Sequence, residues 1–375
     1  MTLSSDPALT CNRLTIDLAA YADNWRALND KSGAAECAAV VKADAYGISI
    51  EKAVTTLTEA GCKTFFVATP EEGLAVRAAD ASATVYILNG LLPGVAKEYT
   101  AHTLRPVLNT IDEVMEWAGQ GRVEPAALHV DTGMNRLGLR EEDALTLGQN
   151  RDLLERVDLT LIMSHLACGD TPRALMNGCQ LSSFVKIAET FPGVSRSLCN
   201  SAGIFHGSSF HLDMVRPGIA LYGGAALNDH HATNPMKPVV KAEARILQIR
   251  DVKEHESVGY GAAEVVDGDR KIATIAAGYA DGYLRRAGST TKEKGASGFL
   301  HGKRVPLVGR VSMDLIAVDV TEVPNAKRGD FVELFGPNIP LSDVAGHAQT
   351  IDYEYLTGLG KRYHRIYRSL GGANG

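Results

Sequence analysis

The sequence predicts an α/β fold: a (β/α)8 TIM barrel followed by a mostly β domain. In the first two thirds of the chain, apolar strand candidates alternate with helical patterns. Such alternation is typical of a parallel sheet with helices on its outside. From about residue 238 the apolar residues recur with period two, and glycine and proline interrupt them at short intervals. This second pattern is typical of strands with one solvated face.

The strand candidates of the first part are short apolar runs, as expected for strands buried on both faces. They lie at 37–42, 64–68, 84–88, 104–108, 127–131, 160–165, 196–200 and 212–216, with helical patterns such as 19–29, 70–77 and 111–117 among them. Eight strand–helix units of this length suit a closed barrel of about 250 residues. The competing fold, a doubly wound open sheet, more often carries a Gly-x-Gly-x-x-Gly turn, and we find none here.

The second part carries alternating strand candidates at 239–246, 271–275, 305–308 and 331–335. We place the domain boundary just after Asn234-Pro235, which gives a barrel over 1–237 and a β-rich domain over 238–375. Residues 289–302 are polar and are predicted to form a loop. Residues 1–12 show no pattern and are expected to fray, and residues 14–18 alternate as a short strand.

Composition narrows the class of protein. The 375 residues carry a net charge of −6 without a basic stripe, which argues against a nucleic-acid partner. No apolar run approaches the roughly 20 residues of a membrane span, and the first residues do not form a signal peptide. The six cysteines form no Cys-x-x-Cys pair. We therefore expect a cytoplasmic protein with reduced thiols and no metal site.

The segment 40–47, Val-Val-Lys-Ala-Asp-Ala-Tyr-Gly, places Lys42 where the first barrel strand ends. A helical pattern begins again at Ser49. A lysine buried there is desolvated, which lowers its pKa and makes its amine a nucleophile. The alternative is an ordinary strand-end lysine paired with Asp44.

The ends of strands seven and eight are where parallel barrels often bind phosphate. After strand seven, Asn200-Ser201-Ala202-Gly203 has the pattern of a helix N-cap, whose free amides suit an anion. Strand eight ends at Arg216, and Gly218 then permits close approach of the backbone. Each feature alone is an ordinary cap or turn. Together they predict a phosphate-bearing ligand.

Further polar side chains follow other strands. Arg136 lies in the run after strand five, His165 ends strand six, and Tyr46 stands four residues after Lys42. In a barrel these strand ends meet at one face. A phosphate site beside a buried lysine suggests pyridoxal 5′-phosphate bound through its aldehyde.

These residues resemble the alanine racemase family, pyridoxal enzymes built from a barrel and a β domain. The resemblance covers nearly the whole chain and is specific through the combination of its motifs. These are 40–47, 131–138 (Asp-Thr-Gly-Met-Asn-Arg-Leu-Gly), Asn200-Ser201, 216–219 (Arg-Pro-Gly-Ile), 259–261 (Gly-Tyr-Gly), 277–283 (Ala-Gly-Tyr-Ala-Asp-Gly-Tyr) and 309–314 (Gly-Arg-Val-Ser-Met-Asp).

The resemblance assigns roles in the cofactor site. It implies that Lys42 holds the cofactor aldehyde. It implies that Arg216 faces the pyridine nitrogen, where a cation keeps that nitrogen unprotonated. Arg136 is expected near the cofactor hydroxyl and the substrate carboxylate, and His165 is expected to link Arg216 to the catalytic tyrosine. The other expected cofactor contacts are Tyr46, Asn200, Ser201, Gly218, Ile219 and Tyr353.

The resemblance also implies that Tyr260 is a second catalytic base, because racemisation removes a proton from one face of Cα and returns one to the other. The Met313 amide is expected to bind the substrate carboxylate, with Tyr279 and Asp314 near the entrance. In the family the β domain serves the partner's barrel, which implies a homodimer with shared active sites.

Two positions depart from the family pattern. His129 stands where a carbamylated lysine is common, which leaves open what orients Arg136. Ser312 stands where a cysteine is common.

The resemblance implies two-base racemisation of L- and D-alanine, which would supply D-alanine for peptidoglycan or serve D-alanine catabolism. The open alternatives are a broad-specificity or serine-preferring racemase, and a non-catalytic pyridoxal-phosphate carrier. Such carriers consist of the barrel alone, so the β domain argues against one. The cysteine motif of the related decarboxylases is not found.

Overall fold

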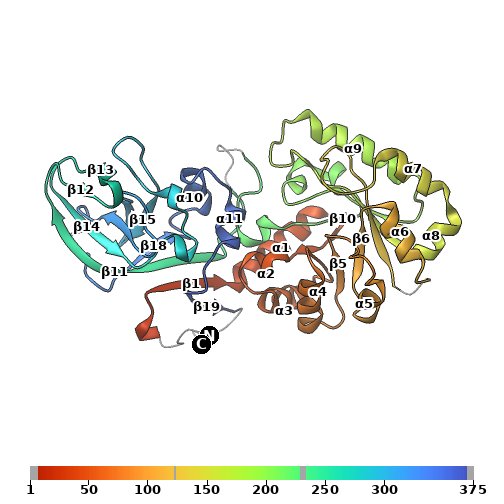
Figure 1. Cartoon of the computed structure of the whole chain (residues 1–375), viewed down its shortest axis with the longest axis horizontal. Helices are drawn as coiled ribbons and strands as arrows, with labels where there is room; N and C mark the ends of the chain where they lie inside the picture. Colours follow the sequence, from red (N-terminus) through yellow and green to blue (C-terminus); the bar gives the residue numbers. More distant parts are fainter. Residues whose placement is uncertain (1–6, 122–123, 229–233, 370–375) are drawn as a thin grey trace. The chain divides into compact units, whose positions relative to one another are not determined.

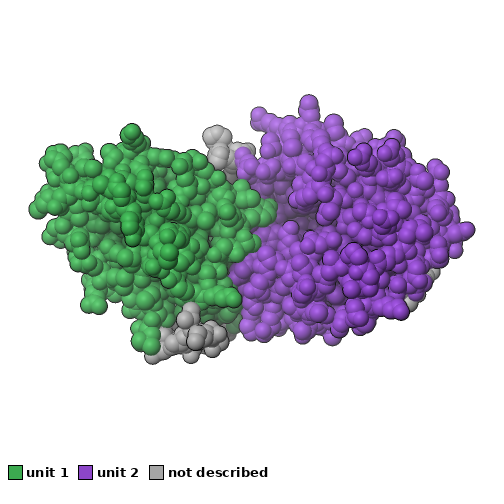
Figure 2. All heavy atoms as spheres, viewed as in Figure 1, with its two compact units in different colours: residues 1–20, 222–224, 237–375 green, residues 21–221, 225–236 purple. Residues whose placement is uncertain are grey.

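The computed structural model describes residues 7–121, 124–228 and 234–369. The chain divides into two compact units (Figure 2). The β-rich unit comprises residues 1–20, 222–224 and 237–375, and the barrel unit comprises residues 21–221 and 225–236. Among the described residues, no helix has the combined length and apolarity that a membrane crossing requires.

The barrel unit is built on parallel strands in the order β3-β4-β5-β6-β7-β8-β9, with helices between them (Figure 1). The strands are β2 (Glu36–Cys37), β3 (Ala39–Val40), β4 (Thr64–Val67), β5 (Thr84–Ile87), β6 (Arg105–Leu108), β7 (Ala126–His129), β8 (Leu159–Met163), β9 (Ser195–Ser197) and β10 (Met214–Val215). The helices are α1 (Leu18–Ser32, which begins in the β-rich unit), α2 (Lys42–Tyr46), α3 (Ile50–Ala60), α4 (Pro70–Ala79), α5 (Ala96–Ala101), α6 (Ile111–Ala118), α7 (Glu141–Gln149), α8 (Arg151–Val157) and α9 (Leu175–Ala188).

Strand β10 closes the sheet into a barrel. On one side it pairs in parallel with β2, and the Val40 amide donates to the Pro217 carbonyl at 2.9 Å. On the other side the Arg216 amide donates to the Cys199 carbonyl at 3.0 Å, just beyond β9. The backbone hydrogen bonds therefore run around the whole ring, and the predicted barrel is confirmed.

The local sequence explains these elements. Every residue of β4 and of β7 is buried, as parallel strands covered on both faces require. Helix α4 begins with a capping box, in which Thr69 and Glu72 satisfy each other's backbone amides. The strand predictions agree with the structure to within a few residues, except at the first. There the strand stops at Val40, and Lys42 already belongs to a separate turn.

The β-rich unit contains an eight-stranded sheet with the path β16-β15-β18-β11-β1-β19 (Figure 1). Off this path, β14 pairs with β11, and β17 pairs with β14. Its strands are β1 (Asn12–Asp17), β11 (Val240–Val252), β14 (Arg270–Ile275), β15 (Ser297–Leu300), β16 (Lys303–Pro306), β17 (Ile316–Asp319), β18 (Phe331–Phe335) and β19 (His364–Arg368). A separate hairpin pairs β12 (Ser257–Val258) with β13 (Glu264–Val265), and two helices, α10 (Leu341–His347) and α11 (Asp352–Thr357), complete the unit.

Two expectations about this unit are corrected. The predicted loop 289–302 contains β15, because Phe299 pairs opposite Glu333 and Gly298 lets the strand pack closely against Val332. The expected fraying of residues 1–12 is wrong from Pro7 onward, where a 3-10 helix spans Pro7–Leu9. The strand predicted at 14–18 is confirmed as β1, which is held between β11 and β19. Residues 1–6 lie outside the described part.

Candidate active site

Lys42 begins a tight turn at the carboxyl end of β3. The four residues after it, Ala43 to Tyr46, all have φ between 51° and 54°, the left-handed region. This conformation costs roughly 1–2 kcal/mol per non-glycine residue. Backbone bonds offset part of that cost, among them Ala45 N to Val41 O and Gly47 N to Ala43 O, both 2.9 Å. Backbone strain of this kind gathers at functional sites.

Two carboxylates hold this turn, Glu72 from α4 and Asp44 from within the turn itself. Glu72 accepts from the Ala43 amide at 2.6 Å and from the Ala68 amide at 2.9 Å, so it ties the turn to the start of α4. Asp44 accepts from the Ile50 amide at 2.9 Å and caps α3. Asp44 is therefore engaged elsewhere, and the ordinary pairing of Lys42 with Asp44 is wrong.

The Lys42 ammonium is partly buried and has no hydrogen bond or ion pair among the described residues. Desolvation lowers its pKa, and the nearby charge of Arg136 lowers it further, while Glu72 acts in the opposite sense. An amine with a lowered pKa is closer to the neutral form that attacks a carbonyl.

The predicted phosphate residues lie together after β9 and β10. Ser201 Oγ accepts from the Gly218 amide at 2.8 Å and from the Ala220 amide at 3.2 Å, which leaves its hydrogen free to donate. A side chain at position 218 would bring Cβ within 2.3 Å of the Tyr46 hydroxyl. Gly218 thus leaves room for close approach between these groups. Ile219 begins a short 3-10 helix, and Asn200 accepts from the Gly203 amide at 3.0 Å, at the start of another short 3-10 helix, Gly203–His206.

Arg216 is buried at the centre of this end of the barrel. One of its terminal nitrogens donates to Ser197 Oγ and the other to the Ser164 carbonyl at 2.6 Å. Burial lowers the pKa of Arg216 to about 10, so it keeps its charge at neutral pH. The described residues include no hydrogen bond from it to His165, so the expected link between them is electrostatic in this structure.

Both histidines of the site are neutral. Desolvation and the charge of Arg216 lower the pKa of His165 to about 3 and that of His129 to about 4. The Asn109 amide donates to the Val107 carbonyl at 2.7 Å, which turns its oxygen toward His129 Nδ1 at 2.8 Å. Nδ1 therefore carries the hydrogen, and Nε2 of the neutral ring keeps its lone pair.

Arg136 is exposed in the loop after β7, and its side chain has no partner among the described residues. The carboxylate of Asp131 holds this loop by accepting from the amides of residues 133–135 at 2.8 to 2.9 Å. The guanidinium is therefore a free cation at the barrel mouth. It lies close enough to lower the pKa of Lys42 and of both histidines.

The other predicted residues belong to the β-rich unit. Tyr260 is 70% exposed, on a short turn next to Arg310. Tyr279 and Met313 lie on two loops joined by backbone bonds, and both are exposed. Within the described residues the Met313 amide has no hydrogen-bond partner. Asp314 pairs with Arg362 at 2.6 Å, and Tyr353 lies partly exposed in α11.

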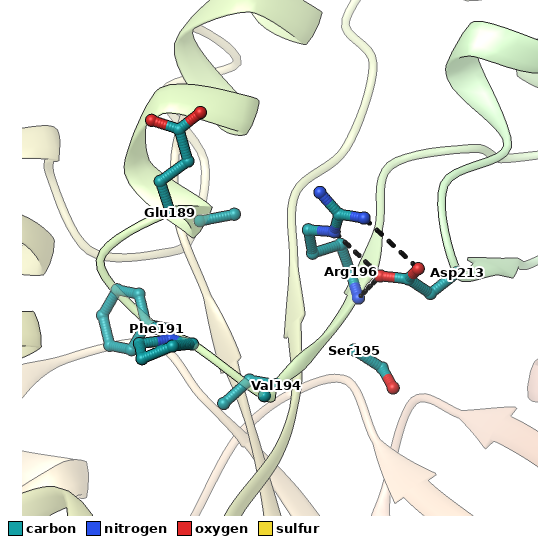
Figure 3. Close-up of a pocket in the computed structure, with 9 residues that line it drawn as sticks. Glu189, Phe191, Val194, Ser195, Arg196 and Asp213 are labelled. Carbon is teal, nitrogen blue, oxygen red and sulfur yellow. Dashed lines mark hydrogen bonds and ion pairs between the residues drawn. The ribbon is translucent and has the colours of Figure 1, made fainter.

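A surface depression at the opposite end of the barrel does not carry this chemistry. It lies near the start of β9, between Glu189, Phe191, Val194, Arg196 and Asp213 (Figure 3). Arg196 and Asp213 pair with each other at 2.8 Å, so their charges are already satisfied. In barrels of this class the amino end of the strands serves stability rather than chemistry.

Four residues that support the site were not predicted from the sequence: Glu72, Asn109, Ser197 and Arg362. The capping box marks Glu72 locally only as the start of a helix. The site partner of each of the four residues lies far away in the chain, so no local pattern marks these roles.

Comparison with known proteins agrees with the fold. Residues 16–226 match the family model of the alanine racemase N-terminal domain, and residues 239–367 match that of the alanine racemase C-terminal domain. An alanine racemase of Rhizobium meliloti (strain 1021) is 48% identical over 373 residues, which covers 96% of this chain and 97% of the relative. A biosynthetic alanine racemase of Agrobacterium fabrum is 48% identical over 95% of this chain and 93% of the relative.

A solved structure is similar throughout. The alanine racemase from Bartonella henselae with covalently bound pyridoxal phosphate superposes with a TM-score of 0.89 at 38% identity. The match covers 96% of this chain and 100% of that one.

Proposed function

This chain belongs to the alanine racemase family, whose members are isomerases of alanine, and we propose that Lys42 and Tyr260 are its two catalytic bases with pyridoxal 5′-phosphate as cofactor. The observation that carries the proposal is the left-handed turn that presents Lys42, unpaired and with a lowered pKa. The same turn places the Tyr46 hydroxyl against Gly218, whose amide is bonded to Ser201.

The residues present fit this cofactor. Ser201 has a free hydroxyl hydrogen, and Gly218 lets the Tyr46 hydroxyl approach closely, so two hydroxyl groups lie together where a phosphate group would be held. Lys42 supplies the amine for the aldehyde, and Arg216 supplies a buried cation for the pyridine nitrogen. When bound, the cofactor withdraws electrons from Cα of the substrate and so makes its proton removable.

The chain's own residues then have to move that proton. Lys42 Nζ takes it from one face of Cα and Tyr260 Oη returns a proton to the other, with the roles exchanged in the reverse direction. Arg136, a free cation at the barrel mouth, binds the substrate carboxylate. The Met313 amide provides a second donor for the same carboxylate. Arg216 keeps its charge at neutral pH and discourages a proton on the cofactor nitrogen.

We further propose a homodimer in which the β-rich unit of one chain completes the barrel site of its partner. The support is that Tyr260 and Met313 are 70% and 53% exposed, although both are expected to meet substrate. A site that moves protons at Cα works best when water is excluded, and a second chain over these two residues would exclude it. The cytoplasm, where thiols stay reduced, suits the six free cysteines.

The experiment for this proposal combines a substrate panel with trapping of the cofactor. L-alanine, D-alanine and L-serine are incubated with the holoenzyme and the enantiomers are separated by chiral chromatography. Racemisation of alanine well above serine is expected. Equal or faster turnover of serine would favour the broad-specificity alternative, and cofactor without turnover would favour the non-catalytic one.

Borohydride reduction followed by peptide mapping should place the cofactor on the peptide that carries Lys42. Label on another lysine would contradict the assigned role. The same chemistry can supply D-alanine for peptidoglycan or remove it in catabolism, and a deletion strain separates the two. A D-alanine requirement shows supply, and failure to grow on D-alanine shows catabolism.

A further inference from the structure

Asp281 is the centre of a charge network in the β-rich unit. Its side chain is 1% exposed. It accepts from Asn12 Nδ2 at 3.1 Å and from the Gly278 amide at 2.9 Å. Arg362 adds two parallel bonds from Nε and Nη2, both 2.8 Å. Arg362 then reaches outward with Nη1 to Asp314 Oδ1 at 2.6 Å. One guanidinium thus joins a buried carboxylate to an exposed one.

Backbone hydrogen bonds join the loop that carries Asp281 to the loop that carries Asp314. The Tyr279 amide donates to the Ser312 carbonyl and the Ala280 amide to the Met313 carbonyl, both at 3.0 Å. A side chain at Gly278 would bring Cβ within 2.2 Å of the Met313 carbonyl oxygen, so the loops are in close contact. The Ser312 amide donates to the Leu315 carbonyl at 3.0 Å, which makes Met313 and Asp314 the tip of a turn.

At this tip only some of the polar groups have hydrogen-bond partners. The Met313 carbonyl is bonded, while its amide has no partner among the described residues. The next side chain, Asp314, is held by Arg362 alone of the described side chains. The Met313 N–H belongs to the peptide group whose Ser312 carbonyl accepts from the Tyr279 amide, and Asp314 on its other side is held by Arg362. Both contacts set the direction of this N–H.

We infer that Arg362 is a positioning residue for substrate binding. It fixes Asp314 against the buried Asp281 and thereby aims the Met313 amide at the substrate carboxylate. The inference rests on the proposed function. Arg362 does not touch substrate. Its planar guanidinium makes bonds to both carboxylates in fixed directions, which the single ammonium of a lysine cannot reproduce.

The first experiment compares Arg362→Lys with the wild-type holoenzyme. The lysine keeps a charge beside Asp281, so the fold and the visible absorbance of the bound cofactor should be retained. The KM for alanine should rise about tenfold with a smaller change in kcat, because a misaimed donor weakens positioning. The inhibition constant of acetate, a carboxylate without a reacting Cα, should rise in parallel.

Asp314→Asn and the double variant Arg362→Lys/Asp314→Asn test whether Arg362 acts on substrate binding through Asp314. If Arg362 acts through Asp314, replacing Arg362 in the Asp314→Asn background should change the KM by less than about twofold. Two independent, multiplying effects would overturn the inference. Arg304→Lys is the matched control, because Arg304 pairs with Asp343 at 3.1 Å on the surface of the same unit and touches neither loop. Its KM should stay at the wild-type value.

The outcomes separate this inference from the proposed function. A wild-type enzyme that neither binds the cofactor nor racemises alanine would contradict the proposed function. An active wild-type enzyme whose Arg362→Lys variant has a lower melting temperature but unchanged KM and acetate inhibition would show a merely structural arginine, and the inference would be wrong. If Arg362→Lys does not fold, Asp314→Asn alone still tests whether Asp314 holds the turn at Met313. An unchanged KM for alanine in Asp314→Asn would also contradict the inference.

Discussion

At the scale of single residues, the mouth of the barrel has an excess of positive charge. Lys42 and Arg136 have no ion partner among the described residues, and Arg216 is bonded to neutral oxygens. The two histidines beside them are neutral because these charges and burial oppose their protonation. A site with this balance suits a ligand with several negative charges, such as a phosphate ester together with a carboxylate.

Lys42→Ala should abolish racemisation and the visible absorbance of lysine-bound cofactor, while circular dichroism stays unchanged. Residual activity below about 10⁻³ of wild type is expected when a nucleophile and base are lost together. Lys52→Ala is the control, because Lys52 pairs with Glu51 on the exposed face of α3. Cofactor absorbance that persists unchanged in Lys42→Ala would show that another amine holds the cofactor.

From the lowered pKa values of the two histidines we expect the free energy of unfolding to depend on pH. His165 and His129 have folded-state pKa values of about 3 and about 4, below the 6.5 of a free histidine. Between those values the unfolded chain binds more protons than the folded one. The free energy of unfolding should therefore fall as pH drops from about 6.5 toward 4, by up to about 1.4 kcal/mol per pH unit for each histidine.

Urea unfolding at pH 7.5, 6 and 5 measures this slope. His129→Gln removes one titrating group, so the slope between pH 6 and 5 should be shallower in this variant than in the wild type. Identical slopes would mean that His129 is protonated in the folded chain, and its assignment as a neutral hydrogen-bond donor to Asn109 would fail.

At the scale of elements, the turn from Lys42 to Tyr46 connects strain with function. Ala43 has a φ of 54° and an exposed side chain, so substitutions there change the backbone preference without disturbing a core. A β-branched residue is strongly disfavoured at positive φ, whereas glycine is not.

Ala43→Val should lower the free energy of unfolding by about 1–2 kcal/mol and weaken cofactor retention, because the turn that presents Lys42 is distorted. Ala43→Gly should leave stability unchanged or raise it by up to about 1 kcal/mol. Thermal melting of holoenzyme and apoenzyme, with cofactor release during dialysis, measures both. Equal behaviour of the two variants would mean that the turn is not left-handed.

The helices and strands differ in how well they can be predicted from the sequence. Apolar runs such as 64–67 and 126–129 are strands because burial on both faces demands it, and this pattern is local. The left-handed turn was not predicted, because alanines normally avoid that region and nothing adjacent marks the exception. Strand β15 was missed since its glycine and polar neighbours resemble a loop. Its pairing with β18 is a long-range contact. Arg362 was missed for the same reason.

At the scale of the whole molecule, the proposed bases lie in different units: Lys42 in the barrel unit and Tyr260 in the β-rich unit. If each active site takes them from different chains, two inactive variants can complement each other. Lys42→Ala and Tyr260→Phe subunits, mixed and refolded together, should form heterodimers with one intact site and one doubly altered site. About half of the wild-type activity per heterodimer is expected.

Affinity tags on each variant allow the heterodimers to be purified before the assay. Each homodimer on its own is the control and should stay inactive. Proven heterodimers without recovered activity would place both bases in the same chain and contradict the shared site.

Racemisation by two separate bases, one for each face of the substrate, can be tested by α-proton exchange. Deuterium wash-in at Cα is followed by NMR for L-alanine and D-alanine separately, in the wild type and in Tyr260→Phe. The variant keeps the ring but lacks the proton carrier. It should lose exchange from L-alanine by about 10² to 10⁴-fold and retain far more exchange from D-alanine, where Lys42 acts. Equal, modest losses for both enantiomers would contradict the two-base mechanism.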